Sequence, residues 1–304
     1  MNNTSCFQDA MLIIKEILRN HDIVDKTFRE DKIAQIYKNM IKNNQKDREF
    51  YSLAHEIKSY DFVSKFGKAH LSNDEKHEPG PDITFGDNRI ECVCSSEGNI
   101  LMTGYEQYSI RYCKGRKKIV DYNKTKEFLL PRITQSLYEK KNKIENYINN
   151  NIIKPTECPI LFLSLGELNV DFHAGNYGIN LLEILVGKGN LTLIFDREKE
   201  KFIDNYWEEN INVKKNNGKE LVDIPAKFFN VNNTKISGVL FSTANIYERY
   251  NLNNTFLFLN PYAKNQINLD NFSDIICWKI NDKNEYIPMK NTNELWDEVK
   301  PEIF

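Results

Sequence analysis

The sequence contains no long apolar run, few cysteines and no excess of charge of one sign. No stretch approaches the roughly 18 apolar residues that span a bilayer, and the first residues lack the basic start and small-residue cleavage site of a signal peptide. The six cysteines are scattered and form no CxxC pair, which excludes a disulfide framework. We therefore expect a reduced, cytoplasmic protein with no membrane partner.

The motifs of two large enzyme classes are missing as well. Gly187-Lys188-Gly189 lacks the spacing and the Lys-Ser/Thr ending of a phosphate-binding loop. Ser237 and Gly238 stand in an apolar run without the Gly-x-Ser-x-Gly pattern of a hydrolase nucleophile, so acyl transfer has no support.

Charge is balanced over the whole chain but uneven along it. The 304 residues include 41 Lys or Arg and 43 Asp or Glu, and the net charge of −2 argues against a protein that coats nucleic acid over its whole surface. Residues 111–143, however, hold eleven basic and three acidic residues, a net charge of +8. Such a run is either a solvated helix face or a strip that contacts phosphate groups.

The first part of the chain is predicted to be helical and the next part to be a β-hairpin. Apolar residues at helical spacing fill residues 8–70, with Asp31 as the expected N-cap of a second helix and a third helix over residues 50–66. A polar loop then precedes two short β-like runs, residues 82–85 and 89–94. Residues 86–88 between them have the Gly and Asn of a tight turn.

The rest of the chain alternates helices and strands. Pro131 is expected to open a helix over residues 132–148. Apolar runs then predict strands at 160–165, 191–195, 236–241 and 255–259, a short helix at 179–186, and loops with an edge hairpin over 199–235. This order predicts a mixed α/β fold with one principal sheet. We expect a helical accessory segment over residues 1–48 and an α/β domain over residues 49–304.

The hairpin carries the residues best suited to chemistry. Asp82 begins one strand and Glu91 lies inside the next, where its neighbours Ile90 and Cys92 are expected to point to the opposite face. A carboxylate inside an apolar strand must be compensated by a cation or by hydrogen bonds. Two converging carboxylates would make an oxygen site for Mg²⁺ or Mn²⁺. Alternatively, Asp82 caps a turn and Glu91 forms a structural ion pair.

Pro81-Asp82, eight further residues and then Glu91-Cys92-Val93 resemble the motif of the PD-(D/E)xK nuclease superfamily, to which many restriction endonucleases belong. The resemblance implies a restriction-endonuclease-like mixed central sheet flanked by helices, with the hairpin presenting the carboxylates. It implies a metal-dependent endonuclease that hydrolyses phosphodiester bonds, usually in DNA. Asp82 and Glu91 would hold Mg²⁺ or Mn²⁺, and Glu56 matches the acidic residue that the superfamily often carries upstream. The partners considered are DNA and a second copy of the chain, as a homodimer.

The chain departs from this motif at Val93, where the superfamily has a lysine that orients the attacking water. In some variants a basic residue from a neighbouring helix replaces it, and Lys140 and Lys141 are the candidates. Lys141 falls on the apolar stripe of the predicted helix, and Lys140 lies one residue round. The residues expected to contact nucleic acid are Arg116, Lys117, Lys118, Arg132 and Gln135.

Two alternatives to a nuclease remain open. The missing lysine also fits a catalytically inactive nuclease fold that binds nucleic acid or a protein partner, and a small-molecule hydrolase built on the same sheet is a third hypothesis. A broader resemblance, over roughly residues 50–265, is to a group of uncharacterised bacterial proteins with a restriction-endonuclease-like N-terminal half. This second resemblance supports the fold more than the reaction.

Overall fold

The computed structural model describes residues 3–43, 48–72, 76, 79–95, 122–164, 181–196, 201–209, 212–216, 221–225, 227–244, 246–280 and 286–289. The helices are α1 (Asn3–Asn20), α2 (Lys26–Asn43), α3 (Arg48–Val63), α4 (Tyr122–Asn149) and α5 (Leu181–Val186), with a 3-10 turn at Leu269–Phe272. The first strands are β1 (Ala69–Leu71), β2 (Ile83–Phe85), β3 (Asn88–Cys94), β4 (Cys158–Ser164), β5 (Lys188–Asp196) and β6 (Lys201–Glu209). The remaining strands are β7 (Asn212–Asn216), β8 (Leu221–Pro225), β9 (Gly238–Ser242), β10 (Thr255–Leu259), β11 (Ile276–Ile280) and β12 (Tyr286–Met289).

In the described part of the chain, one mixed sheet of eight strands organises the fold, in the order β1-β2-β3-β4-β9-β10-β11-β12. β3, β4 and β9 are parallel neighbours, and so are β10 and β11, whereas the other neighbouring pairs are antiparallel. Every residue of β4 is buried, as expected of a central parallel strand that is covered on both faces. The predicted α/β class with one principal sheet is confirmed.

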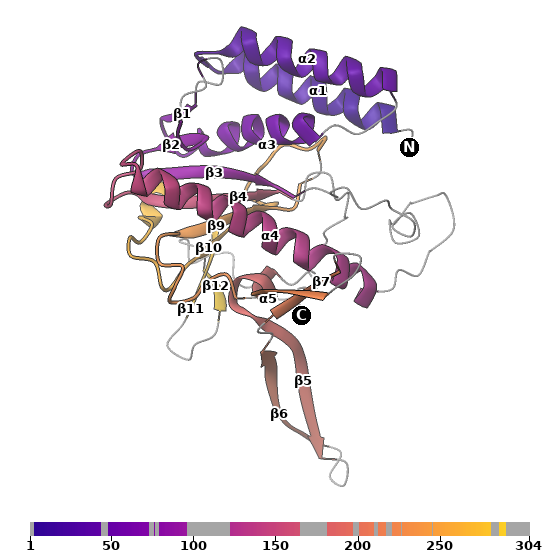
Figure 1. Ribbon diagram of the computed structural model, residues 1–304, viewed down its shortest axis with the longest axis vertical. Coiled ribbons are helices and arrows are strands. Elements are labelled where there is room, and N and C mark those ends of the chain that lie inside the picture. Colours follow the sequence, from indigo (N-terminus) through magenta and orange to yellow (C-terminus); the bar gives the residue numbers. More distant parts are fainter. Residues whose placement is uncertain are drawn as a thin grey trace.

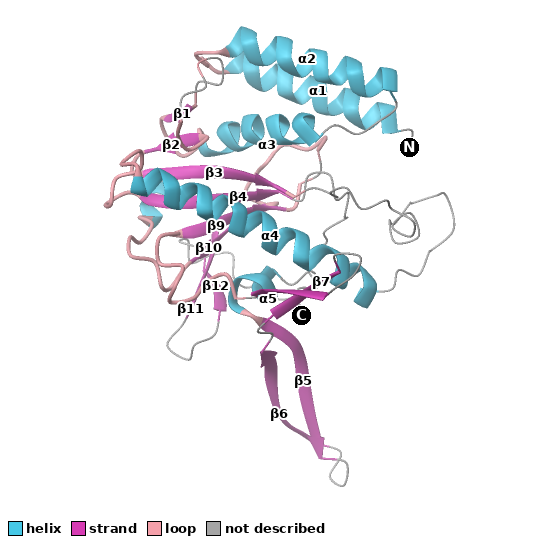
Figure 2. Ribbon diagram, viewed as in Figure 1, coloured by secondary structure: helices cyan, strands magenta, loops and turns pink. Residues whose placement is uncertain are grey.

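Helices cover both faces of this sheet (Figure 2). Alternation along β3 sends Ile90 and Cys92 into an apolar core shared with α1, α2 and α3. Val93 points the other way, into a second core formed with Leu137 and Ile144 of α4. The helices α1 and α2 lie beyond α3 as an outer layer (Figure 1). The sheet therefore has an α3 face and an α4 face, and the candidate site belongs mainly to the second.

Two expectations about helix starts are wrong. α2 begins at Lys26, so Asp31 lies within it; the first turn is instead closed at Asp25, whose backbone oxygen accepts the Arg29 amide at 3.0 Å. α4 begins at Tyr122, so Pro131 lies in its interior. A proline there removes one hydrogen bond but does not stop a helix whose remaining turns are held by packing.

The region around residues 188–225 is also richer in strands than expected. β5 corresponds to the predicted strand, but it pairs with β6 in a separate two-stranded sheet that projects from the body (Figure 1). β7 and β8 pair in another two-stranded sheet, where loops and one edge hairpin were expected. No helix within the described part of the chain is long and apolar enough to cross a membrane.

Candidate functional site

The β2–β3 hairpin places one predicted carboxylate, Glu91, within β3 and the other, Asp82, immediately before β2. The turn residue Gly86 adopts a φ of 54°, in the left-handed region that glycine tolerates best. The strands pair with Ile83 opposite Ile90. Asp82 immediately precedes β2, and extending this register by one residue sets it across from Glu91, whose negative charge acts on the Asp82 carboxyl. The predicted hairpin is confirmed, and its geometry brings the two carboxylates together.

Glu91 is completely buried, with 0% of its side chain exposed, and two lysines compensate its charge. Lys140 Nζ and Lys143 Nζ each donate to Glu91 Oε1 at 2.6 Å. The other oxygen, Oε2, is buried without a hydrogen-bond partner among the described residues. A buried carboxylate needs compensation, and the two lysines supply the positive charge that the apolar strand cannot. The lone pairs of Oε2 stay available to another ligand.

Asp82 is partly buried and is held by the backbone of β3. Its Oδ2 accepts a hydrogen bond from the Cys92 amide at 2.6 Å. Burial, together with the negative charge of Glu91, raises the pKa of the Asp82 carboxyl to about 6, against the opposing effects of Lys140, Lys143 and the Cys92 amide. Asp82 is thus ionised at neutral pH and protonated in mild acid.

The two lysines remain strongly cationic. Burial disfavours the charged ammonium of Lys140, but the negative charges of Glu91 and Asp82 outweigh it and raise its pKa. The pKa of Lys143 is raised for the same reasons, with a further hydrogen bond to Tyr147. Both lysines are therefore suited to stabilising negative charge and unsuited to acting as general bases, because they stay protonated.

The structure separates the lysines that the sequence could not rank. Lys140 contacts Glu91, whereas Lys141 pairs with Glu145 at 3.4 Å, one helical turn along α4. Lys143 was not predicted at all. Its signal in the sequence is its position three residues after Lys140 and four before Tyr147, whose ring it approaches at 5.5 Å.

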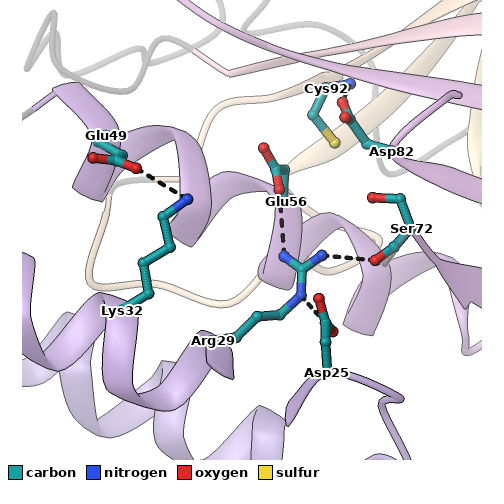
Figure 3. A network of polar contacts seen from close by, with 8 residues as sticks. All are labelled: Asp25, Arg29, Lys32, Glu49, Glu56, Ser72, Asp82 and Cys92. Carbon is teal, nitrogen blue, oxygen red and sulfur yellow. Dashed lines mark hydrogen bonds and ion pairs between the residues drawn. The ribbon is translucent and has the colours of Figure 1, made fainter. Parts of the chain in front are cut away.

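Glu56 approaches β3 from the opposite face to Glu91. It projects from α3, and its Oε2 lies 3.5 Å from Nη1 of Arg29. In Figure 3 its carboxylate lies between Arg29 and Cys92. Among the described residues, no group of three or more His, Cys, Asp or Glu side chains is placed to hold a metal ion. The structure thus brings Asp82 and Glu91 together but does not add Glu56 to them as a third ligand.

The predicted nucleic-acid contacts are only partly described. Arg132 and Gln135 are half-buried on α4, and Gln135 Nε2 donates to Glu139 Oε1 at 2.8 Å. Arg116, Lys117 and Lys118 lie outside the described residues.

A second buried polar cluster, on the α3 face, was not predicted. His55 Nε2 lies 2.6 Å from the Phe162 carbonyl oxygen and Nδ1 lies 2.7 Å from the Tyr250 hydroxyl. A carbonyl can only accept, so Nε2 carries the proton and Nδ1 accepts from Tyr250. Lys58 Nζ donates to the Ile246 and Glu248 carbonyl oxygens at 3.3 and 3.1 Å, and it lies 4.4 Å from the Tyr250 ring centroid. Together these contacts join α3 to residues 246–250.

Burial sets the ionisation of this cluster. It lowers the pKa of His55 to about 3, although the bond to the Phe162 carbonyl opposes this. It also lowers the pKa of Lys58 to about 7, against the attraction of Cys94 and Glu248. His55 is therefore neutral at physiological pH, whereas Lys58 titrates near physiological pH.

Comparison of the chain with known protein families, with curated proteins and with solved structures found no match.

Proposed function

We propose that this chain is a divalent-metal-dependent nuclease of the restriction-endonuclease-like class, acting on DNA. The observation that carries the proposal is that one hairpin brings Asp82 within reach of the charge of Glu91, to which two lysines from α4 donate. In support, α3 precedes the three antiparallel strands β1, β2 and β3, and α4 connects β3 to its parallel neighbour β4. This is a mixed sheet flanked by helices, with a hairpin that presents carboxylates.

The donor set fits a hard divalent cation. Asp82 supplies a carboxylate that is ionised at neutral pH, and Glu91 supplies a buried oxygen, Oε2, that has no hydrogen-bond partner among the described residues. When bound there, Mg²⁺ or Mn²⁺ would activate water and neutralise charge at a phosphate. Lys140 and Lys143 both bind Oε1 of Glu91, so the metal ion would bind the other carboxylate oxygen, Oε2.

Lys140 takes the role of the lysine that Val93 does not supply. It reaches the Glu91 carboxylate from α4, on the face to which the side chain of residue 93 also points. Because the surrounding carboxylates raise its pKa, Lys140 would donate a hydrogen bond to the attacking water or to a phosphate oxygen and would not act as a base. Lys143 would hold Glu91 in place and add positive charge. The basic strip before and along α4 is the proposed DNA-binding surface.

One observation favours a second candidate, a metal-free module that binds nucleic acid or a protein. The two carboxylates, Asp82 and Glu91, are matched in number by two ammonium groups, so the cluster is neutral without a metal ion. In this case Glu91 and the lysines would form a structural ion cluster, and chelation would leave ligand binding unchanged.

Titration calorimetry with Mn²⁺ distinguishes the two candidates. We compare the wild type with Asp82→Asn and Glu91→Gln, which remove charge with little change of shape, and with Glu145→Gln as a matched acidic control on α4. The nuclease proposal predicts stoichiometric binding that is lost in the first two variants and kept in the control. Each titration is run with and without a short DNA duplex, so that a metal ion that binds only together with a DNA phosphate is also detected. Absence of binding in both conditions, or DNA cleavage that persists in excess chelator, would overturn the proposal.

A further inference from the structure

Among the residues that the structure describes, Arg29 is the largest charged side chain that is fully buried, with 0% of its side chain exposed. It lies on α2, in the helical segment that precedes the sheet. A buried guanidinium must find acceptors for its N–H donors, and those of Arg29 come from three elements. Nε donates to Asp25 Oδ1 at 2.9 Å, Nη1 approaches Glu56 Oε2 at 3.5 Å, and Nη2 donates to the Ser72 carbonyl oxygen at 2.8 Å.

These contacts continue directly to the candidate site (Figure 3). The amide of Ser72 donates to the backbone oxygen of Asp82 at 2.8 Å. The Asp82 side chain in turn accepts the Cys92 amide at 2.6 Å. Arg29 therefore fixes Ser72, which in turn holds the backbone of Asp82. Arg29 also contacts Glu56, which lies near Cys92.

We infer that Arg29 is a positioning residue for the Asp82 carboxylate and that the helical segment completes the site through this contact. The inference rests on the proposed function, because it assigns Arg29 a role in the metal affinity of the same site. A planar guanidinium can bind two carboxylates and a carbonyl at once, a geometry that an ammonium does not reproduce. The role of Arg29 therefore differs from that of a cation that merely balances charge.

A second α2–α3 ion pair provides the matched control. Lys32 Nζ lies 3.0 Å from Glu49 Oε1, and both side chains are substantially exposed. Figure 3 shows this pair to one side, away from Ser72 and Asp82. Lys32→Met removes an exposed ion pair between the same two helices without touching Ser72 or Asp82.

The test uses Arg29→Lys and the double variant Asp25→Asn/Arg29→Gln, which removes the Asp25 charge together with that of Arg29. Amide hydrogen exchange is followed by NMR at Ser72 and Cys92. Ser237 serves as the reference, because its amide donates to the Pro159 carbonyl oxygen at 2.7 Å elsewhere in the sheet. Mn²⁺ affinity is measured in parallel at a temperature where each variant is folded.

If Arg29 positions Asp82, both Arg29 variants exchange the Ser72 and Cys92 amides roughly 10-fold faster relative to Ser237 and bind Mn²⁺ roughly 10-fold more weakly. Lys32→Met changes neither quantity. Equal acceleration at all three amides, or unchanged Mn²⁺ affinity, would assign Arg29 to general stability and overturn the inference. If the wild type binds no Mn²⁺, the proposed function fails, and the exchange comparison alone decides whether Arg29 positions Asp82.

Discussion

Replacing Lys140 and Lys143 with methionine, singly and together, tests how the buried carboxylate of Glu91 is stabilised. Both ammonium groups lie 2.6 Å from the same oxygen, and they are 31% and 41% exposed. A charge-assisted hydrogen bond contributes about 1.5–3 kcal/mol, and solvent screening of a partly exposed lysine reduces this. We therefore expect each single variant to lose about 1–2 kcal/mol of unfolding free energy.

The double variant leaves Glu91 buried without a cation, which costs about 3–5 kcal/mol. Its loss is therefore expected to exceed the sum of the two single losses, because either lysine alone still compensates the charge. Adding Glu91→Gln to the double variant removes the buried charge and restores part of the stability. Urea unfolding at pH 8, followed by circular dichroism, measures all of these differences.

Lys141→Met is the control, since Lys141 pairs with Glu145 instead of Glu91. Substitutions away from such buried features usually change stability by about 0.5 kcal/mol or less. A double variant that is no less stable than Lys141→Met would refute the reasoning, because Glu91 would then not depend on the two lysines. A loss that Glu91→Gln fails to reduce would point to lost packing of the lysine stems and not to charge.

Two further predictions concern the pH dependence of stability in the buried cluster on the α3 face. The pKa of Lys58 is about 7 in the folded state and ordinarily about 10.4, so between these values the unfolded chain binds more protons than the folded protein. Stability should therefore rise with pH through this window, by at most about 1.4 kcal/mol per pH unit. Urea unfolding at pH 7 and 9 should show this rise in the wild type and a smaller one in Lys58→Met. The pKa of His55 is about 3 when folded and ordinarily about 6.5, so stability should fall as the pH drops from 6.5 towards 3. Melting temperatures at pH 7 and 4.5 should show a smaller acid loss in His55→Gln, and an equal loss would contradict the assignment of neutral His55.

Much of the fold follows from local patterns in the sequence. The hairpin was predicted because two short β-like runs are joined by Gly86 and Asn88, residue types that tolerate a positive φ, and Gly86 adopts one. The continuous apolar run of β4 predicted a fully buried strand, and β4 is fully buried. The prediction at Pro131 failed because a rule for helix starts describes a preference, which the packing of a long helix can override.

The lysine partners of Glu91 show the limit of such patterns. Lys140, Lys141 and Lys143 lie within four residues of one helix, where successive side chains point about 100° apart. Which of them reaches Glu91 depends on the rotation of α4 about its own axis. That rotation is set by the packing of Ile133, Leu137 and other residues of α4 in the core on this face of the sheet, a tertiary property.

The sequence by itself determined several elements and the candidate chemistry of this protein. It identified a helical start, a hairpin with Asp82 and Glu91, and the need for a cation or hydrogen bonds beside a carboxylate in an apolar strand, because these depend on neighbouring residues and on burial energetics. Only the tertiary structure decided the partners. His55 and Tyr250 are 195 residues apart in the chain, and Arg29 reaches Ser72 across 43 residues. Such contacts carry no local pattern, because they arise when separate elements pack together and buried polar groups must find partners.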